Sequence, residues 1–209
     1  MKGKRFGVVC SVVSVMVLCA GSVRAQGTNE MGTVKGAFKE EMKSYFDEQR
    51  AENKAFRSEE MGVTNLDEKI STIVEHINQQ YQENKAFFAK LHGEVMTKIK
   101  DRMSKNSRLS AAQQTDVINF FEKQYQENVA FRDTEHQTLI SGLQALESKQ
   151  GLSKEEIRSQ IKSLFEKCKE DRESHRKTQE AENKAFREKM REEAKAAKGS
   201  ASGSAAATK

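Results

Sequence analysis

The side chains best suited to metal chemistry are four histidines, three of which lie on or beside apolar helix stripes. They are His76, His92, His136 and His175. Imidazole is a common metal ligand, but a metal site needs several ligands that converge on one point. His92 and His136 each follow an Asn by eight residues. On antiparallel helices these offsets run in opposite directions and separate the two rings by ~24 Å. A site shared by His92 and His136 is therefore expected only across a dimer, and the candidate metal ligands are His136 and His175.

Polar residues also interrupt the apolar stripes near their centres. They are Asn84, Asn128, Arg132, His136, Arg172, His175 and Gln179. Folding the third and fourth predicted helices about the turn near Gln150 brings Asn128 level with His175. One interpretation is a buried polar layer that fixes register, as a core Asn does in coiled coils, and the other is a binding site. If Asn128 only fixes register, Asn128→Leu is expected to keep or raise thermal stability while broadening the range of association states.

No other grouping in the sequence points to catalysis or to a cofactor. There is no Gly-rich phosphate loop, no Ser/His/Asp grouping and no Cys pair, and the many carboxylates lie on charged faces. Cys168 lies on an apolar stripe, so we expect it to be a small core residue. The sequence therefore predicts a protein that is not an enzyme and that has no cofactor.

A repeated phrase, Glu-Asn-x-Ala-Phe, occurs four times in the chain. Its Asn and Phe residues are Asn53 and Phe56, Asn84 and Phe87, Asn128 and Phe131, and Asn183 and Phe186. The two middle copies are 44 residues apart, and their similarity extends to Tyr81 and Tyr125. Such repetition indicates one supersecondary unit copied along the chain. These residues are the candidate binding or core motif, because a half-exposed aromatic row could also bind apolar chains.

The composition favours long helices, since the chain contains no proline. The predicted helices span residues 34–60, 65–105, 110–149 and 153–197. Each of the last three begins with an apolar residue and a capping residue, Thr64, Ser110 or Ser153. Gln113 and Glu156 stand where the acid or amide of a capping box reaches back to the helix start.

Apolar residues at alternating steps of three and four predict the fold class. It is an all-α fold, an elongated antiparallel coiled-coil bundle of about four long helices built from a 44-residue repeat. The Tyr, Asn and Phe of the repeated phrase spread over ~120° of a helix, enough to reach two neighbouring helices. The fourth Asn is expected at Arg172 but occurs 11 residues later, which keeps it on nearly the same face.

The chain begins with the features of a secretory signal peptide. Basic residues precede a charge-free apolar stretch from Phe6 to Ala20, and small residues lead to a cleavage point after Ala25. The stretch is too short for an ordinary membrane span. The expected division is a signal at 1–25, a flexible N-terminus at 26–33, the bundle at 34–197 and a flexible Gly/Ser/Ala tail at 198–209.

Removing the signal changes the charge argument. The net charge of +5 includes four basic residues within 1–25, so the remainder carries 36 − 4 = 32 basic and 31 acidic residues. A net charge of +1 with intermixed signs leaves no electrostatic footprint for nucleic acid.

One short motif resembles a known family. Leu109-Ser110-Ala111-Ala112-Gln113 is similar to the Leu-Thr-x-x-Gln hallmark of the CpxP/Spy group of bacterial periplasmic proteins, with Ser in place of Thr. The resemblance implies a helical periplasmic chaperone or stress protein. The tandem repeat and the Glu-Asn-x-Ala-Phe phrase are not features of that group.

These observations lead to three expected functions. The first is an exported, non-enzymatic helical binding protein, periplasmic if bacterial, that acts as a chaperone or envelope-stress protein on unfolded or partner chains. The second is a structural or scaffolding coiled-coil protein, and the third is a metal-binding sensor. The expected partners are proteins, including further copies of the chain, with no nucleic acid and no stable membrane span after signal cleavage.

Overall fold

The computed structural model describes residues 28–60, 66–107, 109–149 and 153–206, and within them every element is a helix. The helices are α2 (Thr28–Glu60), α3 (Leu66–Ser104), α4 (Ala111–Glu147) and α5 (Lys154–Ala206). The all-α prediction is confirmed. The start of α2 is six residues before the predicted position and the end of α5 nine residues after it, whereas α3 and α4 agree within two residues. The predicted signal peptide lies outside the described residues.

Two of the predicted capping boxes are present. At the start of α4, the Ser110 N–H donates to Oε1 of Gln113 (3.0 Å), and the Gln113 N–H donates to Oγ of Ser110 (3.2 Å). Ser153 and Glu156 make the same reciprocal pair before α5, at 2.8 and 3.2 Å. These bonds satisfy N–H groups that the first helical turn leaves without partners. The box predicted at Thr64 lies outside the described residues.

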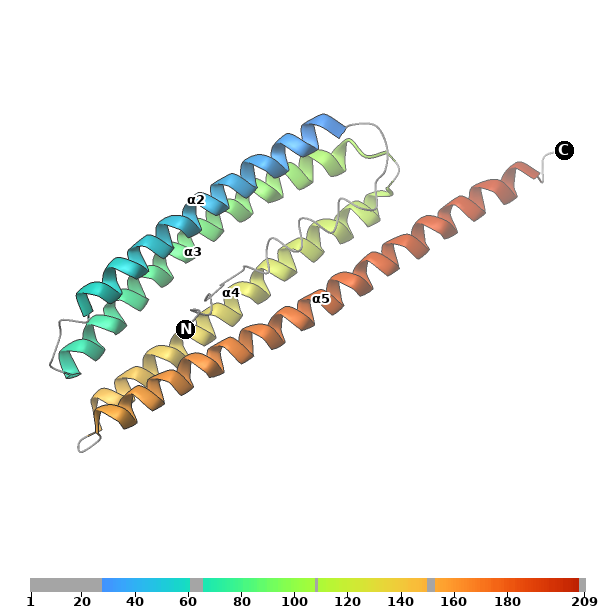
Figure 1. Ribbon diagram of the computed structural model, residues 1–209. Helices are drawn as coiled ribbons and strands as arrows, with labels where there is room; N and C mark the ends of the chain where they lie inside the picture. The colour runs from blue at the N-terminus through green and yellow to red at the C-terminus, as the bar shows by residue number, and fades with distance from the viewer. Residues whose placement is uncertain (1–27, 61–65, 108, 150–152, 207–209) are drawn as a thin grey trace, which may run out of the picture. The chain divides into compact units, whose positions relative to one another are not determined.

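The described chain divides into two compact units, and three of the helices contribute to both. Unit I contains the described residues between 28 and 87 and between 134 and 168, and unit II contains those between 88 and 133 and between 169 and 206. In Figure 1, α2 runs antiparallel beside α3, and α4 runs antiparallel beside α5. Short connections make consecutive helices antiparallel neighbours.

Unit I has the larger apolar core. Its buried residues are Ile70, Val74, Leu139, Ile140, Leu143, Leu146, Ile157 and Cys168. Cys168 is 3% exposed, so the prediction of a core residue is confirmed. Gly142 of α4 allows a close approach to α5, because a Cβ there would lie 2.7 Å from a methyl carbon of Leu164.

Unit II has a smaller apolar cluster around Met96 and Phe121.

The partly buried side chains that pack against this cluster are Ile99, Val117 and Ile118. Phe88, Leu91 and Val95 of α3 are also buried in unit II. No helix among the described residues is both long enough and apolar enough to cross a membrane.

Candidate helix-pairing site

The polar layer predicted in α4 and α5 is a hydrogen-bonded network centred on Asn128, which is 6% exposed. Its Nδ2 donates to the backbone carbonyl of Gln124 (2.7 Å) and to Oε1 of Gln179 (2.9 Å). Its Oδ1 lies 3.1 Å from Nε2 of His175. Both amide hydrogens are therefore used, and the amide oxygen faces a ring nitrogen. The predicted level match between Asn128 and His175 is confirmed.

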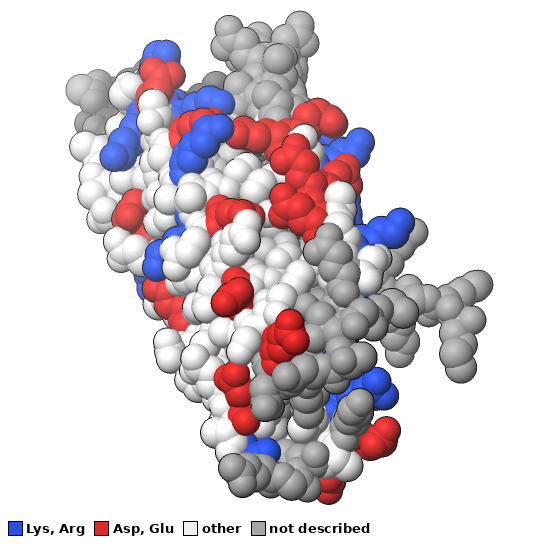
Figure 2. Space-filling model, turned by 90° about the vertical axis from the view of Figure 1, so that its left-hand side faces the viewer, with Lys and Arg blue, Asp and Glu red and all other residues white. Residues whose placement is uncertain are grey.

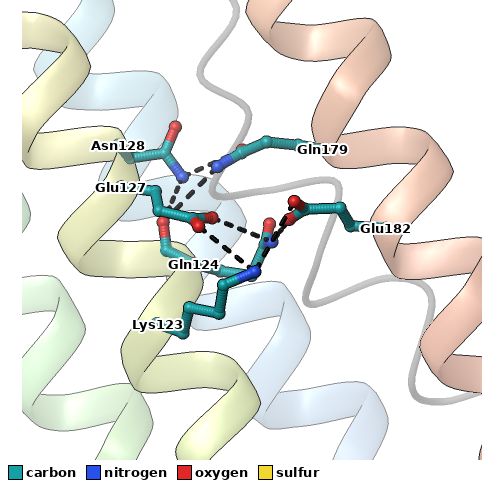
Figure 3. A network of polar contacts seen from close by, with 6 residues as sticks. All are labelled: Lys123, Gln124, Glu127, Asn128, Gln179 and Glu182. Atoms are coloured by element: carbon teal, nitrogen blue, oxygen red, sulfur yellow. Dashed lines mark hydrogen bonds and ion pairs between the residues drawn. The ribbon is translucent and has the colours of Figure 1, made fainter.

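Charged groups border this amide network at the side of Gln124 (Figure 3). Gln124 is 2% exposed and donates through Nε2 to Glu182 of α5 and, at 3.4 Å, to Glu127. Nζ of Lys123 lies 3.2 Å from Glu127 and 3.5 Å from Glu182. The hydrogen bond to Glu127, with the nearby carboxylate charges, raises the pKa of Lys123. One lysine thus bridges carboxylates from both helices.

Stacked rings lie on both sides of the amide network. Phe131 of α4 stacks on His175 of α5, with ring centroids 4.2 Å apart and planes within 3°. Phe186 of α5 stacks on Phe120 of α4 at 4.0 Å and 1°. All four rings are half-buried. Aromatic pairs of this kind contribute roughly 0.5–1.5 kcal/mol beyond area burial.

The pair formed by α2 and α3 in unit I repeats the amide network. Nδ2 of Asn53 donates to the carbonyl of Gln49 (2.7 Å) and to Oε1 of Gln80 (2.9 Å). Its Oδ1 lies 3.2 Å from Nε2 of His76. Asn53 therefore makes the same three bonds in its helix pair that Asn128 makes in the other.

The carboxylate contact is also repeated in unit I. Nε2 of Gln49 donates to Glu83 of α3 at 2.9 Å and to Glu52 at 3.1 Å. Hydrogen bonds from Gln79 and Gln49 lower the pKa of Glu83. Position 48, which corresponds to Lys123, holds a glutamate, so this copy lacks the bridging lysine.

The stacked rings are repeated as well. Phe56 stacks on His76 at 3.9 Å and 8°, and Phe87 stacks on Tyr45 at 3.9 Å and 4°. We call each set of stacked rings and central amides a pairing layer. The pairing layer of α2–α3 contains Tyr45, Gln49, Asn53, Phe56, His76, Gln80, Glu83 and Phe87. That of α4–α5 contains Phe120, Gln124, Asn128, Phe131, His175, Gln179, Glu182 and Phe186.

The pairing layers reveal a longer motif than the repeated phrase. In every copy a Gln stands four residues before the Asn and an aromatic residue or His stands eight before it. The eighth-position residues are Tyr45, His76, Phe120 and His175. Each is the stacking partner of the Phe from the paired copy. Sequence reasoning noted the Gln in the two middle copies but missed the residue at the eighth position, although aligning all four copies on their Asn would have shown it.

The second and fourth Asn residues of the phrase have a simpler role. Nδ2 of Asn84 donates to the carbonyl of Gln80 (2.6 Å), and Nδ2 of Asn183 donates to the carbonyl of Gln179 (2.7 Å). Each bond stays within one helix. Asn183 is buried, whereas Asn84 is half-buried.

The repeated phrase also reaches a second neighbour, as predicted. In unit I, Tyr81 of α3 stacks on His136 of α4 at 3.8 Å, while Phe87 of the same helix stacks on Tyr45 of α2. Nε2 of His136 lies 2.9 Å from Oδ1 of Asn78. The phrase in α3 therefore contacts both α2 and α4.

A matching contact occurs within unit II. Tyr125 of α4 stacks on His92 of α3 at 3.7 Å and 4°. Nε2 of His92 lies 3.0 Å from Oε2 of Glu122. Each of these three residues is 44 positions from its counterpart in the unit I contact.

The two candidate metal ligands belong to different contacts. His136 is held by Asn78 and Tyr81 in unit I, and His175 by Asn128 and Phe131 in unit II. In the described part of the chain, no group of three or more His, Cys, Asp or Glu side chains is placed to hold a metal ion. Instead, each of the four histidine side chains contacts a residue of a neighbouring helix.

No protein-family model matches this chain, and no similar protein was found among curated proteins or solved structures.

Proposed function

We propose that this chain is a non-enzymatic, exported scaffolding protein, whose helix pairs are antiparallel coiled coils built from the repeated motif. The observation that carries the proposal is the use of all four motif copies in helix pairing. Each copy contributes a Phe to an interhelical stack and a Gln or Asn to an interhelical hydrogen bond. The Phe, Gln and Asn residues of the motif, which could have formed a binding surface, instead form contacts between helices of the same chain.

The surface supports the same proposal. Among residues whose burial is described, every Val, Ile, Leu, Met, Phe and Tyr is buried or half-buried. Figure 2 shows acidic and basic side chains distributed over the visible face, with uncharged residues between them. A large exposed apolar patch is the usual mark of a surface that binds unfolded chains. None of the large apolar side chains whose burial is described is fully exposed, and this distribution favours a scaffold.

Small-angle X-ray scattering of residues 26–209 tests the scaffold. A compact domain of this length has a radius of gyration of ~16 Å, whereas a 40-residue helix alone spans ~60 Å. The proposal therefore expects a rod-like particle whose radius of gyration clearly exceeds the compact value. A compact sphere would contradict it.

A holdase-like chaperone is the second candidate, and the half-exposed stacked rings favour it. The resemblance of Leu109–Gln113 to the CpxP/Spy motif points in the same direction. The test is light scattering of an unrelated unfolding protein mixed with residues 26–209, without nucleotide. Suppression of aggregation at near-stoichiometric ratios would support the chaperone. No suppression, together with a rod-like particle, would leave the scaffold.

We propose that the protein is exported, because residues 1–25 have the features of a secretory signal peptide. The exported protein is expected to begin at Gln26, because Ala25 is the first well-placed small residue after the apolar stretch. Intact-mass measurement of exported material decides this point. A species that retains Met1 would contradict it.

A further inference from the structure

The hydrogen bonds around His175 fix which of its ring nitrogens carries hydrogen in the neutral state. Both hydrogens on Nδ2 of Asn128 are directed to carbonyl oxygens, of Gln124 and Gln179, which accept and cannot donate. The remaining Oδ1 of Asn128 is an acceptor, so Nε2 of His175 must donate to it. The basic nitrogen of this tautomer is therefore Nδ1.

A second proton would find no acceptor on the protein at that position. Within the described part of the chain, Nδ1 of His175 has no hydrogen-bond partner. The ring is half-buried, with Phe131 stacked against it at 4.2 Å. A new positive charge would therefore lose part of its hydration without gaining a hydrogen bond to the protein.

The nearby charges act on His175 in both directions. Glu127 of α4 and Glu182 of α5 favour its protonated form, and Arg132 of α4 opposes it. Burial is the largest influence, and it lowers the pKa of His175 below the ordinary value of 6.5. The neutral ring is thus the form that the paired helices prefer.

We propose that the α4–α5 pairing layer is an acid-sensitive contact, in which His175 takes up one proton at Nδ1 and helix pairing weakens. The proton comes from water, and no covalent bond is broken. The Nε2–H bond to Asn128 can persist, so the weakening comes from the cost of placing a charge in a half-buried position. The inference goes beyond the scaffolding role and does not depend on it.

The direction of the pH effect follows from linkage. The unfolded chain binds a proton at His175 more readily than the folded chain does. The stability contribution is therefore complete well above pH 6.5. It declines as the pH falls through 6.5, and the loss is complete below the folded-state pKa. Ordinary carboxyl groups titrate lower, near 4.5, so pH 7.5 and 5.5 isolate the histidine range.

The experiment compares the thermal midpoints of residues 26–209 at pH 7.5 and 5.5. The wild type is expected to lose thermal stability at the lower pH, and His175→Phe to show much less of this loss. Phe at this position keeps a stack on Phe131, because the chain already contains the Phe120–Phe186 stack at the other side of the layer. His92→Phe is the matched control. His92 also stacks on a ring, but its Nε2 lies 3.0 Å from a carboxylate oxygen of Glu122.

An NMR titration of the His175 ring in the wild-type chain gives an independent measurement, which holds even if the variant folds poorly. The proposal expects a midpoint below 6.5. A midpoint above 6.5 would overturn it. An unchanged acid loss in a folded His175→Phe variant would also overturn it.

Discussion

Phe186 of α5 lies parallel to Phe120 of α4, with ring centroids 4.0 Å apart and planes within 1°. This stack explains why the fourth motif copy occurs late in the sequence. From Asn128 to Ser153 is 25 residues, and from Ser153 to Gln179 is 26. An antiparallel pair requires such equal distances on both sides of its turn. The pairing of α4 with α5, and not a constant period, accounts for the position of the fourth copy.

The same arithmetic holds for the other helix pair. From Asn53 to Leu66 is 13 residues, and from Leu66 to Gln80 is 14. The two pairs carry equivalent pairing layers at different distances from their turns.

The hydrogen bonds of Asn128 reverse the expectation for Asn128→Leu. Leucine would leave His175 and Gln179 without their buried partner, so we expect a loss of about 1–3 kcal/mol in the free energy of unfolding. Chemical denaturation measures this loss. Asn84→Leu is the matched control and should cost less, because Asn84 bonds only to the carbonyl of Gln80 in its own helix. Retained or increased stability in Asn128→Leu would show that Asn128 acts mainly on register.

Adjacent phenylalanines in α3 should differ in their contribution to stability. Phe88 is 5% exposed, so Phe88→Ala should cost roughly 3–5 kcal/mol, the usual scale for a buried aromatic. Phe87 is half-buried in its stack on Tyr45, and Phe87→Ala should cost less. A double-mutant cycle of Phe87→Ala with Tyr45→Ala should give a coupling of about 0.5–1.5 kcal/mol. Zero coupling would mean that the stack does not contribute to pairing.

The two capping boxes should differ in how their contributions to stability depend on pH. Hydrogen bonds from the backbone and side chain of Ser153 lower the pKa of Glu156 below 4.5. The contribution of the carboxylate is therefore present above pH 4.5 and is lost as the pH falls through the lowered pKa. Glu156→Gln should be less stable than the wild type at pH 6 but not at pH 3. Thermal unfolding of both proteins between pH 3 and pH 6 measures this difference in stability.

The box at Ser110 supplies the reciprocal test, since Gln113 does not titrate. Gln113→Glu should introduce a pH-dependent contribution at the start of α4. A gap between Glu156→Gln and the wild type that stays constant with pH would contradict the assignment of Glu156.

Two helical glycines should respond differently to alanine. A Cβ at Gly93 meets nothing within 4 Å, so Gly93→Ala should stabilise the protein by about 0.8–1.0 kcal/mol through helix propensity. At Gly142 the same group would lie 2.7 Å from Leu164, so part or all of that gain is lost as Leu164 moves. Equal stabilisation of the two variants, measured by denaturant unfolding, would contradict close packing at Gly142.

The helices could be predicted from the sequence because their signals are local. Caps at Ser110 and Ser153, apolar periodicity and the absence of proline locate α4 and α5 without reference to the rest of the chain. Counting residues from the turn was also enough to place Asn128 level with His175.

The pairing layers could not be fully predicted, because comparison of two copies 44 residues apart hides what all four share. Gln49 and Tyr45 belong to a copy outside that comparison. The orientation of each amide depends on its partners in the folded chain, which sequence spacing does not determine. The stacking of Phe87 on Tyr45 instead of burial in an apolar core is likewise a property of side-chain packing.

Burial of Cys168 gives the protein an internal reporter of its own opening. Once residues 1–25 are removed, as we propose, this residue carries the single thiol of the chain. At 3% exposure it lies within the apolar core of unit I, where a thiol reagent cannot reach it. The rate of its modification in the native protein therefore measures how often that core opens. No label or substitution needs to be introduced.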